Sequence, residues 1–185
     1  MSTLRVAATA ENCEVLAPEP SFGVWVQGCS ICCPGCAAAA LWDPEGGVVA
    51  EAGELARRAR AAGSSLALLG GEPLDQAEGA KELCETARAA GLAVTLYTGY
   101  ARDAAIERHP WILSCVDLLL AGPFMLARRR EGLPFVGSDN QTVDYLTSRY
   151  ERHEPEGAAC ELRIGADGGI TLFGYPGADL VDSIT

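Results

Sequence analysis

The sequence has few positively charged residues and no long apolar run. It contains 14 Lys and Arg against 25 Asp and Glu, a formal net charge of −11. A phosphate backbone would be repelled by such a chain, so we expect no nucleic-acid partner. No apolar run reaches the roughly 18 residues of a membrane-spanning helix, so we expect no membrane span. The stretch Met1–Ala10 carries one charged side chain, Arg5, and does not resemble a secretion signal, which predicts a cytoplasmic protein.

Histidine is scarce as well, with two residues, whereas the chain has eight cysteines. Without a secretion signal, so many cysteines favour metal ligands or reactive thiols over a disulfide framework. Half of them lie within one stretch of eight positions: Cys29, Cys32, Cys33 and Cys36. The others are dispersed along the chain, and we expect Cys84 and Cys115 to pack in the core as small apolar side chains.

Segments typical of strands alternate with segments typical of helices between Phe22 and Gly122. The predicted strands are 22–27, 65–69, 92–98 and 117–121, and the predicted helices are 51–62, 75–90 and 101–108. Apolar strands separated by helices indicate a mostly parallel sheet with covered faces. A complete eightfold barrel needs about 250 residues. We therefore predict an α/β fold, an open partial (β/α) barrel with its functional residues at the C-terminal ends of the strands.

The C-terminal third has a weaker pattern. Segments 159–164 and 170–173 flank the turn-forming residues Asp167, Gly168 and Gly169, which predicts a β-hairpin extension. Segment 132–156 is predicted to be a long surface loop with one strand or helix inside it. The basic run 128–130 is predicted to be a solvated helix end, with a contact for phosphate or an acidic partner as the alternative. No domain boundary is evident, so we expect one domain over 1–185.

Three of the clustered cysteines, Cys29, Cys33 and Cys36, have the spacing C-x3-C-x2-C directly after a predicted strand. Three thiolates on one loop can bind three irons of a 4Fe–4S cubane and leave the fourth iron without a protein ligand. An open metal position can bind a substrate, as in catalytic metal sites generally.

The same stretch can also be divided into two tandem pairs, Cys29-x2-Cys32 and Cys33-x2-Cys36, which would suit a four-thiolate zinc site. Adjacent Cys32 and Cys33 would then have to direct both sulfurs to one ion, which is strained. We expect Cys32 to be a bystander, and zinc remains the alternative.

The segment VWVQGCSICCPGCAAAALWDPEGG resembles the cluster loop of radical S-adenosylmethionine (SAM) enzymes, in particular the anaerobic ribonucleotide reductase activating proteins. The resemblance covers roughly residues 23–144. It continues, in the family's order, in Gly70-Gly71-Glu72-Pro73, Tyr97-Thr98-Gly99-Tyr100, Gly122-Pro123-Phe124 and Gly137-Ser138-Asp139-Asn140-Gln141.

The resemblance implies roles for individual residues. Cys29, Cys33 and Cys36 would hold a 4Fe–4S cluster, and SAM would bind its open iron. The other implied SAM contacts are Gly70, Gly71, Glu72 and Pro73 at the methionine amino group, Gly35 and Ala37 at the adenine, and Thr98 and Gly99 in the same pocket. From the residues alone, two glycines allow close approach of a ligand and Glu72 can accept a hydrogen bond from an ammonium. The alternative is an ordinary strand-to-helix turn with an acidic first residue.

The resemblance further implies an activating enzyme that removes a hydrogen atom from a glycine of a partner enzyme, with a flavodoxin- or ferredoxin-type electron donor. Two departures from the family pattern, Ala121 in place of an acid and the alanines 37–40 after the last cysteine, leave a small-molecule or peptide substrate as an alternative. A non-enzymatic iron–sulfur electron-transfer or structural metal-binding protein is the second alternative.

Overall fold

The computed structural model describes residues 1–150 and 160–176. Seven strands form one sheet in the order β3-β1-β2-β4-β5-β6-β7. Their bounds are β1 (Thr3–Cys13), β2 (Ser21–Val26), β3 (Val48–Glu51), β4 (Ser65–Gly70), β5 (Val94–Thr98), β6 (Leu118–Ala121) and β7 (Thr142–Tyr145). The central strands β2, β4, β5 and β6 are parallel, and β1, β3 and β7 join the sheet through antiparallel pairs.

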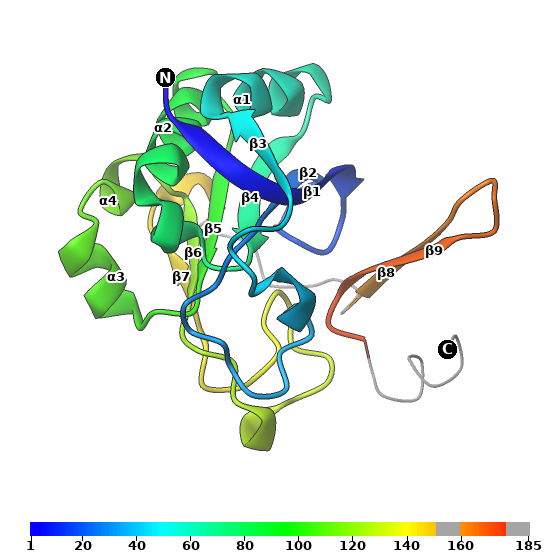
Figure 1. Ribbon diagram of the computed structural model, residues 1–185. Helices are drawn as coiled ribbons and strands as arrows, with labels where there is room; N and C mark the ends of the chain where they lie inside the picture. Colours follow the sequence, from blue (N-terminus) through cyan, green and yellow to red (C-terminus); the bar gives the residue numbers. More distant parts are fainter. Residues whose placement is uncertain (151–159, 177–185) are drawn as a thin grey trace.

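Helices lie together on one side of this sheet in Figure 1. They are α1 (Ala52–Ala61), α2 (Ala77–Ala89), α3 (Arg102–Arg108) and α4 (Ile112–Cys115). Short 3-10 turns occur elsewhere in the chain, as η1 (Ala39–Leu41), η2 (Pro73–Gln76), η3 (Leu126–Arg128) and η4 (Ser148–Tyr150). Within the described residues, no helix is both long and apolar enough to cross a membrane.

The predicted mixed α/β fold with parallel central strands is confirmed. The sheet that the described residues form is open, with β3 and β7 at its edges. The further expectation, that this open sheet curves into a partial barrel, stays a prediction. Sequence patterning missed the antiparallel strands β1 and β3. It placed one element inside 132–156, where β7 and η4 lie; the part after residue 150 falls outside the described residues. The expectation of a surface loop is wrong at Phe135 and Val136, which are buried.

The two faces of the sheet differ because successive side chains of a strand point to opposite sides. In β4, Leu66 and Leu68 pack in the main core with α1 and α2. The alternate residue Ala67 belongs to a second cluster on the other face, and Leu69 packs against that cluster. The helices complete the main core through residues spaced three and four apart, such as Leu55 and Ala59 of α1. Cys84 and Cys115 are buried in this core, as predicted.

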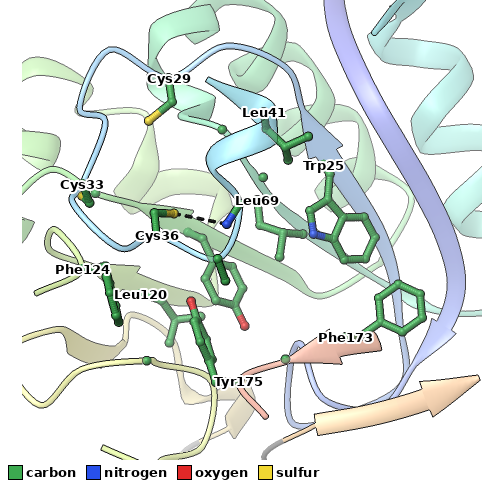
Figure 2. A pocket seen from close by; sticks show the side chains of 18 of the residues that line it. Trp25, Cys29, Cys33, Cys36, Leu41, Leu69, Leu120, Phe124, Phe173 and Tyr175 are labelled. Atoms are coloured by element: carbon green, nitrogen blue, oxygen red, sulfur yellow. Dashed lines mark hydrogen bonds between the residues drawn. The ribbon is translucent and has the colours of Figure 1, made fainter. Parts of the chain in front are cut away.

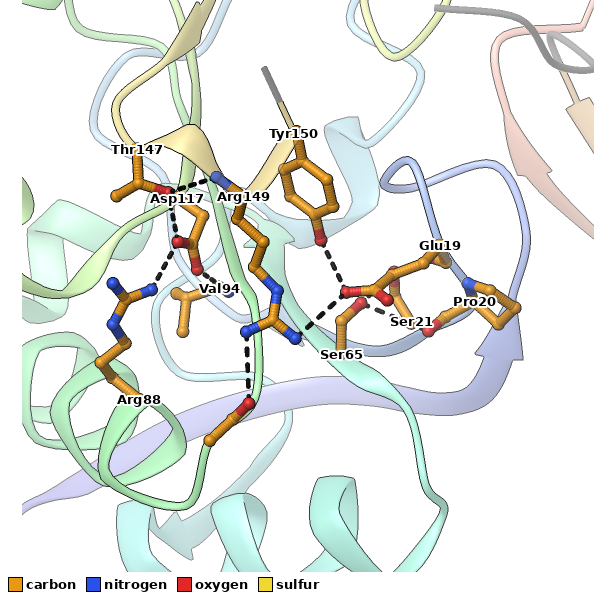
Figure 3. A network of polar contacts seen from close by, with 11 residues as sticks. Glu19, Pro20, Ser21, Ser65, Arg88, Val94, Asp117, Thr147, Arg149 and Tyr150 are labelled. Atoms are coloured by element: carbon orange, nitrogen blue, oxygen red, sulfur yellow. Dashed lines mark hydrogen bonds and ion pairs between the residues drawn. The ribbon is translucent and has the colours of Figure 1, made fainter. Parts of the chain in front are cut away.

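A polar network lies near the N-terminal ends of the parallel strands (Figure 3). Its centre is Asp117, whose side chain is fully buried. The carboxylate pairs with Arg88 and accepts hydrogen bonds from Val94 N at 3.0 Å and Thr147 Oγ1 at 2.6 Å. Burial by itself raises the pKa of Asp117, but these three donors outweigh it and hold the pKa below its usual value. The network joins α2, β5 and the segment after β7 at the end opposite the cysteine loop.

The predicted C-terminal hairpin is present as β8 (Cys160–Ile164) and β9 (Ile170–Gly174), a separate two-stranded sheet; predicted residue 159 lies outside the described residues. Arg163 donates 2.8 Å hydrogen bonds to the carbonyls of Glu11 and Asn12, just before the β1–β2 corner. Phe173 packs on Trp25 with ring centroids 5.4 Å apart. The hairpin is thus attached to the sheet face that carries no helices.

Candidate functional site

A cavity of about 880 Å³ opens on the helix-free face, at the C-terminal ends of the parallel strands. The loops that follow β2, β4, β5 and β6 all contribute to its wall, through Cys29, Gly71, Gly99 and Phe124 among others. Ligands of open α/β sheets bind at this end because successive loops converge there. The volume is within the range of cofactor and substrate sites.

Three of the four clustered cysteines, Cys29, Cys33 and Cys36, line this cavity. Figure 2 shows the three side chains around one end of it, all on the loop after β2. Cys32 does not line the cavity; it is exposed, and its thiol donates to the carbonyl of Cys29 at 3.0 Å. The backbone of Cys32 has φ +48°, so this residue forms the bend that turns Cys29 and Cys33 toward the same space.

Backbone hydrogen bonds fold the cysteine loop back on itself. Gly28 N donates to Leu41 O at 2.8 Å, and Cys29 N donates to Trp42 O at 3.2 Å. Ala38 N donates to the Cys36 sulfur at 3.4 Å. Amide hydrogen bonds to ligand sulfurs are one means by which proteins tune iron–sulfur centres.

Burial raises the pKa of the Cys29 thiol and of the Cys33 thiol. Metals bind the thiolate form, so ligation at these two residues would release protons, and the metal cations would offset the thiolate charge that burial disfavours.

The segment Gly70–Glu72 lies directly against the start of the cysteine loop. Gly70 has φ +111°, and a Cβ on it would lie 2.6 Å from Val26 N. A Cβ on Gly71 would overlap the carbonyl oxygen of Gly28. Glycine is therefore required at both positions by the close approach of two backbone segments.

Glu72 is a buried acid, 1% exposed, at the cavity wall. Its Oε1 accepts from Leu74 N at 2.9 Å and Thr98 Oγ1 at 2.8 Å, and its Oε2 accepts from Gly99 N at 2.8 Å. Burial, partly offset by these donors, raises the pKa of Glu72 to about 7. The carboxylate therefore joins the loops after β4 and β5, and it also caps the first turn of η2.

Ten of the predicted site residues come together at this one cavity. Lining it, besides the three cysteines, are Gly35, Ala37, Gly70, Gly71, Glu72, Thr98 and Gly99. Pro73 does not line it; this residue is buried at the first position of η2. Proline is favoured there because the missing N–H has no partner within the helix.

Sequence patterning missed the wall opposite the cysteines. Trp25 of β2 lies in this wall together with Phe173 and Tyr175 of the C-terminal hairpin segment (Figure 2). Tyr97 of β5 also lines the cavity from the helix-free face. Burial raises the pKa of Tyr175 to about 12, with a smaller effect from Cys36. The alternation of side chains along each strand could have indicated that Trp25 and Tyr97 point to the same face of the sheet. Nothing local in the sequence indicates that Phe173, nearly 150 positions later, packs on Trp25.

The basic run 128–130 lies at the rim of the cavity and is largely paired. Arg128 and Arg130 contact Asp139 at 2.6 and 3.1 Å, and Arg129 donates to Pro176 O at 2.8 Å. The two Asp139 contacts stay within the loop after β6, whereas the Arg129 contact joins this loop to the end of the hairpin. The expected solvated helix end is therefore only partly correct, because Arg129 and Arg130 line the cavity.

The donor set suits a cluster with three protein ligands. Among the described residues, the only cysteines that line the cavity are Cys29, Cys33 and Cys36, and no three His, Cys, Asp or Glu side chains converge closely enough to hold one metal ion. In a cubane each thiolate binds its own iron, so the ligands surround a volume and do not converge on a point. The three thiols around one end of an open cavity are compatible with that arrangement.

A family match agrees with this chemistry. A comparison with curated proteins returned no match. Residues 21–144, about two thirds of the chain, match the family described as 4Fe-4S single cluster domain. The match begins with β2, includes the cysteine loop and ends within β7, before the hairpin. The chain belongs to the 4Fe-4S single cluster domain family, which is found in radical SAM enzymes.

Proposed function

We propose that this protein is a radical SAM enzyme in which Cys29, Cys33 and Cys36 are the protein ligands of a 4Fe–4S cluster. When bound, such a cluster supplies one electron that cleaves SAM at its open iron into methionine and a 5′-deoxyadenosyl radical, which removes a hydrogen atom from a substrate. The cofactor carries this chemistry, and the protein contributes binding, orientation and exclusion of water.

One observation carries the proposal. The cavity that the three cysteines line continues past them along Gly70, Gly71, Thr98 and Gly99 to the aromatic wall. A protein that only transfers electrons needs no such space beside its cluster, whereas a protein that binds a second ligand at the cluster does. The glycines that line this space place no side chain in it, which lets a ligand such as an amino acid moiety approach the backbone closely.

The chain's own residues would orient the second ligand. We propose that the Gly70–Glu72 segment contacts its methionine part, with Glu72 holding the loops after β4 and β5 together. We propose that the backbone of Gly35 and Ala37 contacts its adenine. Trp25, Phe173 and Tyr175 would exclude water from the far wall, which protects a reactive intermediate.

We further propose that the hydrogen atom comes from a glycine of a large partner enzyme and that a flavodoxin- or ferredoxin-type protein donates the electron. Support comes from the resemblance of the five sequence blocks to activating proteins. The departures at Ala121 and 37–40 keep a peptide or small-molecule substrate as the second candidate.

Anaerobic reconstitution with iron and sulfide, followed by addition of reductant and SAM, tests the chemistry. The expected product is 5′-deoxyadenosine, and a Cys36→Ser variant should form none. A protein that binds the cluster but forms no 5′-deoxyadenosine would be an electron-transfer or structural protein.

Incubation with candidate glycyl-radical partners tests the activating role by electron paramagnetic resonance. Turnover of SAM without an organic radical on any partner would exclude that role and favour the second candidate.

A further inference from the structure

The short turn η2, which follows Glu72, contacts both sides of Cys29. On one side, Gln76 Nε2 donates to Gln27 O at 2.8 Å. On the other side, Asp75 Oδ2 accepts from Ser30 N at 2.7 Å and Asp75 Oδ1 accepts from Ser30 Oγ at 2.8 Å. Two neighbouring side chains of one turn thus hold the residues that bracket the first cysteine.

The turn is itself well anchored. Glu72 caps it through Leu74 N and joins it to Thr98 and Gly99. Gln76 also exchanges hydrogen bonds with the backbone of Arg5, accepting from its N–H at 2.7 Å and donating to its carbonyl at 3.1 Å. A carboxylate on this turn therefore has a defined position although Asp75 is exposed.

Tyr100, in the loop after β5, also contacts Asp75 and Ser30. Its hydroxyl donates to Asp75 Oδ1 at 3.2 Å and lies 3.3 Å from Ser30 Oγ. The guanidinium of Arg108 lies 5.3 Å from the centroid of the Tyr100 ring, which holds the ring in place. The carboxylate of Asp75 thus connects the cysteine loop with the loops after β4 and β5.

We propose that Asp75 is a positioning residue for the cluster, acting through Ser30 to fix Cys29. The inference rests on the proposed cluster ligation. Ser30 and Cys32 are exposed, and Cys32 is at the bend of the loop. Charge-assisted hydrogen bonds that Ser30 donates to a preorganised carboxylate limit how far this stretch can move. Partners outside the ligand shell fix the orientation of metal ligands in the same way.

The test compares full-length wild type with Asp75→Ala, Asp75→Asn and Ser30→Ala after anaerobic reconstitution. Glu78→Gln is the matched control, because Glu78 is an exposed acid in α2 next to the same turn. The readouts are the rate at which EDTA removes iron, the paramagnetic resonance spectrum of the reduced cluster, and the thermal melting of the metal-free protein.

We expect Asp75→Ala to lose iron roughly five- to tenfold faster than wild type, the factor that corresponds to one or two weakened hydrogen bonds. Asp75→Asn should be intermediate, because one oxygen acceptor remains. Ser30→Ala should show the smallest change, because it keeps the backbone N–H. The resonance line shape should change in both Asp75 variants, an effect that a general loss of stability would not produce. Glu78→Gln should match wild type in every readout.

Iron loss at the wild-type rate in both Asp75 variants would overturn the proposal, as would a wild type that takes up no cluster. If metal-free Asp75→Ala does not fold, Asp75→Asn and Ser30→Ala decide the outcome. A wild type that holds the cluster and forms no 5′-deoxyadenosine would exclude the proposed enzymatic function and leave the Asp75 comparison valid. The two proposals can therefore fail separately.

Discussion

Gly71 packs directly on the carbonyl group of Gly28, so that even a methyl group at Gly71 would overlap the carbonyl oxygen. The next residue confirms the close approach, since Glu72 N donates to the same oxygen at 2.8 Å. The loop after β4 thereby holds the residue that precedes Cys29. This contact between two loops explains why a Gly-Gly pair stands beside a cysteine loop 42 positions away in the sequence.

Replacing Gly71 with Ala should destabilise the protein by about 1–3 kcal/mol, because the added methyl group meets backbone and not a flexible side chain. Chemical denaturation of the metal-free protein measures the effect. Gly53→Ala is the control: Gly53 is in α1, a Cβ there has nothing within 4 Å, and the change should stabilise by up to about 1 kcal/mol. Equal stability of Gly71→Ala and wild type would contradict the packing described.

Serine substitutions should distinguish the three proposed cluster ligands from Cys32. We expect Cys29→Ser, Cys33→Ser and Cys36→Ser each to lower cluster affinity more than about 100-fold, beyond the effect of losing an outer contact. Cys32→Ser should lower cluster affinity by less than about tenfold, because Cys32 does not line the cavity. Iron and sulfide content after anaerobic reconstitution measures this. Loss of the cluster in Cys32→Ser, with retention in Cys29→Ser, would assign the ligands differently.

Asp117→Asn should lower the free energy of unfolding at pH 7 by about 2–4 kcal/mol, since an amide cannot accept from Arg88, Thr147 and Val94 together. The folded protein lowers the pKa of Asp117 from its ordinary value of 3.8. The stabilisation is therefore complete above about pH 4 and is lost as the pH falls through the lower, folded-state pKa.

Urea denaturation between pH 7 and pH 2 should show a shallower loss of stability on acidification for Asp117→Asn than for wild type. Asp103→Asn is the control, because the Asp103 side chain is 92% exposed. If the free energy of unfolding falls with pH equally in wild type and in Asp117→Asn, the pKa of Asp117 is the same in the folded and the unfolded protein, which would contradict the prediction.

Arg163→Ala should loosen the C-terminal hairpin without unfolding the sheet. Arg163 lies over the Phe173 ring at 5.0 Å and donates to two carbonyls at the end of β1. Hydrogen exchange in 160–174 should become about 5- to 30-fold faster, while amides of α2 exchange as in wild type. Ile164→Ala should have little effect, because Ile164 is 71% exposed. Unchanged exchange in Arg163→Ala would place the attachment of the hairpin elsewhere.

The local features of this protein follow from short-range sequence patterns. The alternation of apolar strands and helices predicted β2, β4, β5 and β6 together with α1, α2 and α3, because burial periodicity is a short-range property. The cysteine spacing and the glycine-rich segment after β4 were visible for the same reason. The start of the second helix was less predictable, since η2 precedes α2 and depends on the Glu72 cap.

The way in which these parts meet depends on the fold as a whole. The antiparallel strands β1 and β3 have no distinctive pattern of their own; β1 pairs with β2, and β3 pairs with β1. Asp75 lies 45 positions from Ser30, and Phe173 lies still further from Trp25. Such contacts depend on which loops the sheet topology brings together. The sequence therefore predicted the cysteine loop, whereas the fold supplied the residues that hold it and the wall that faces it.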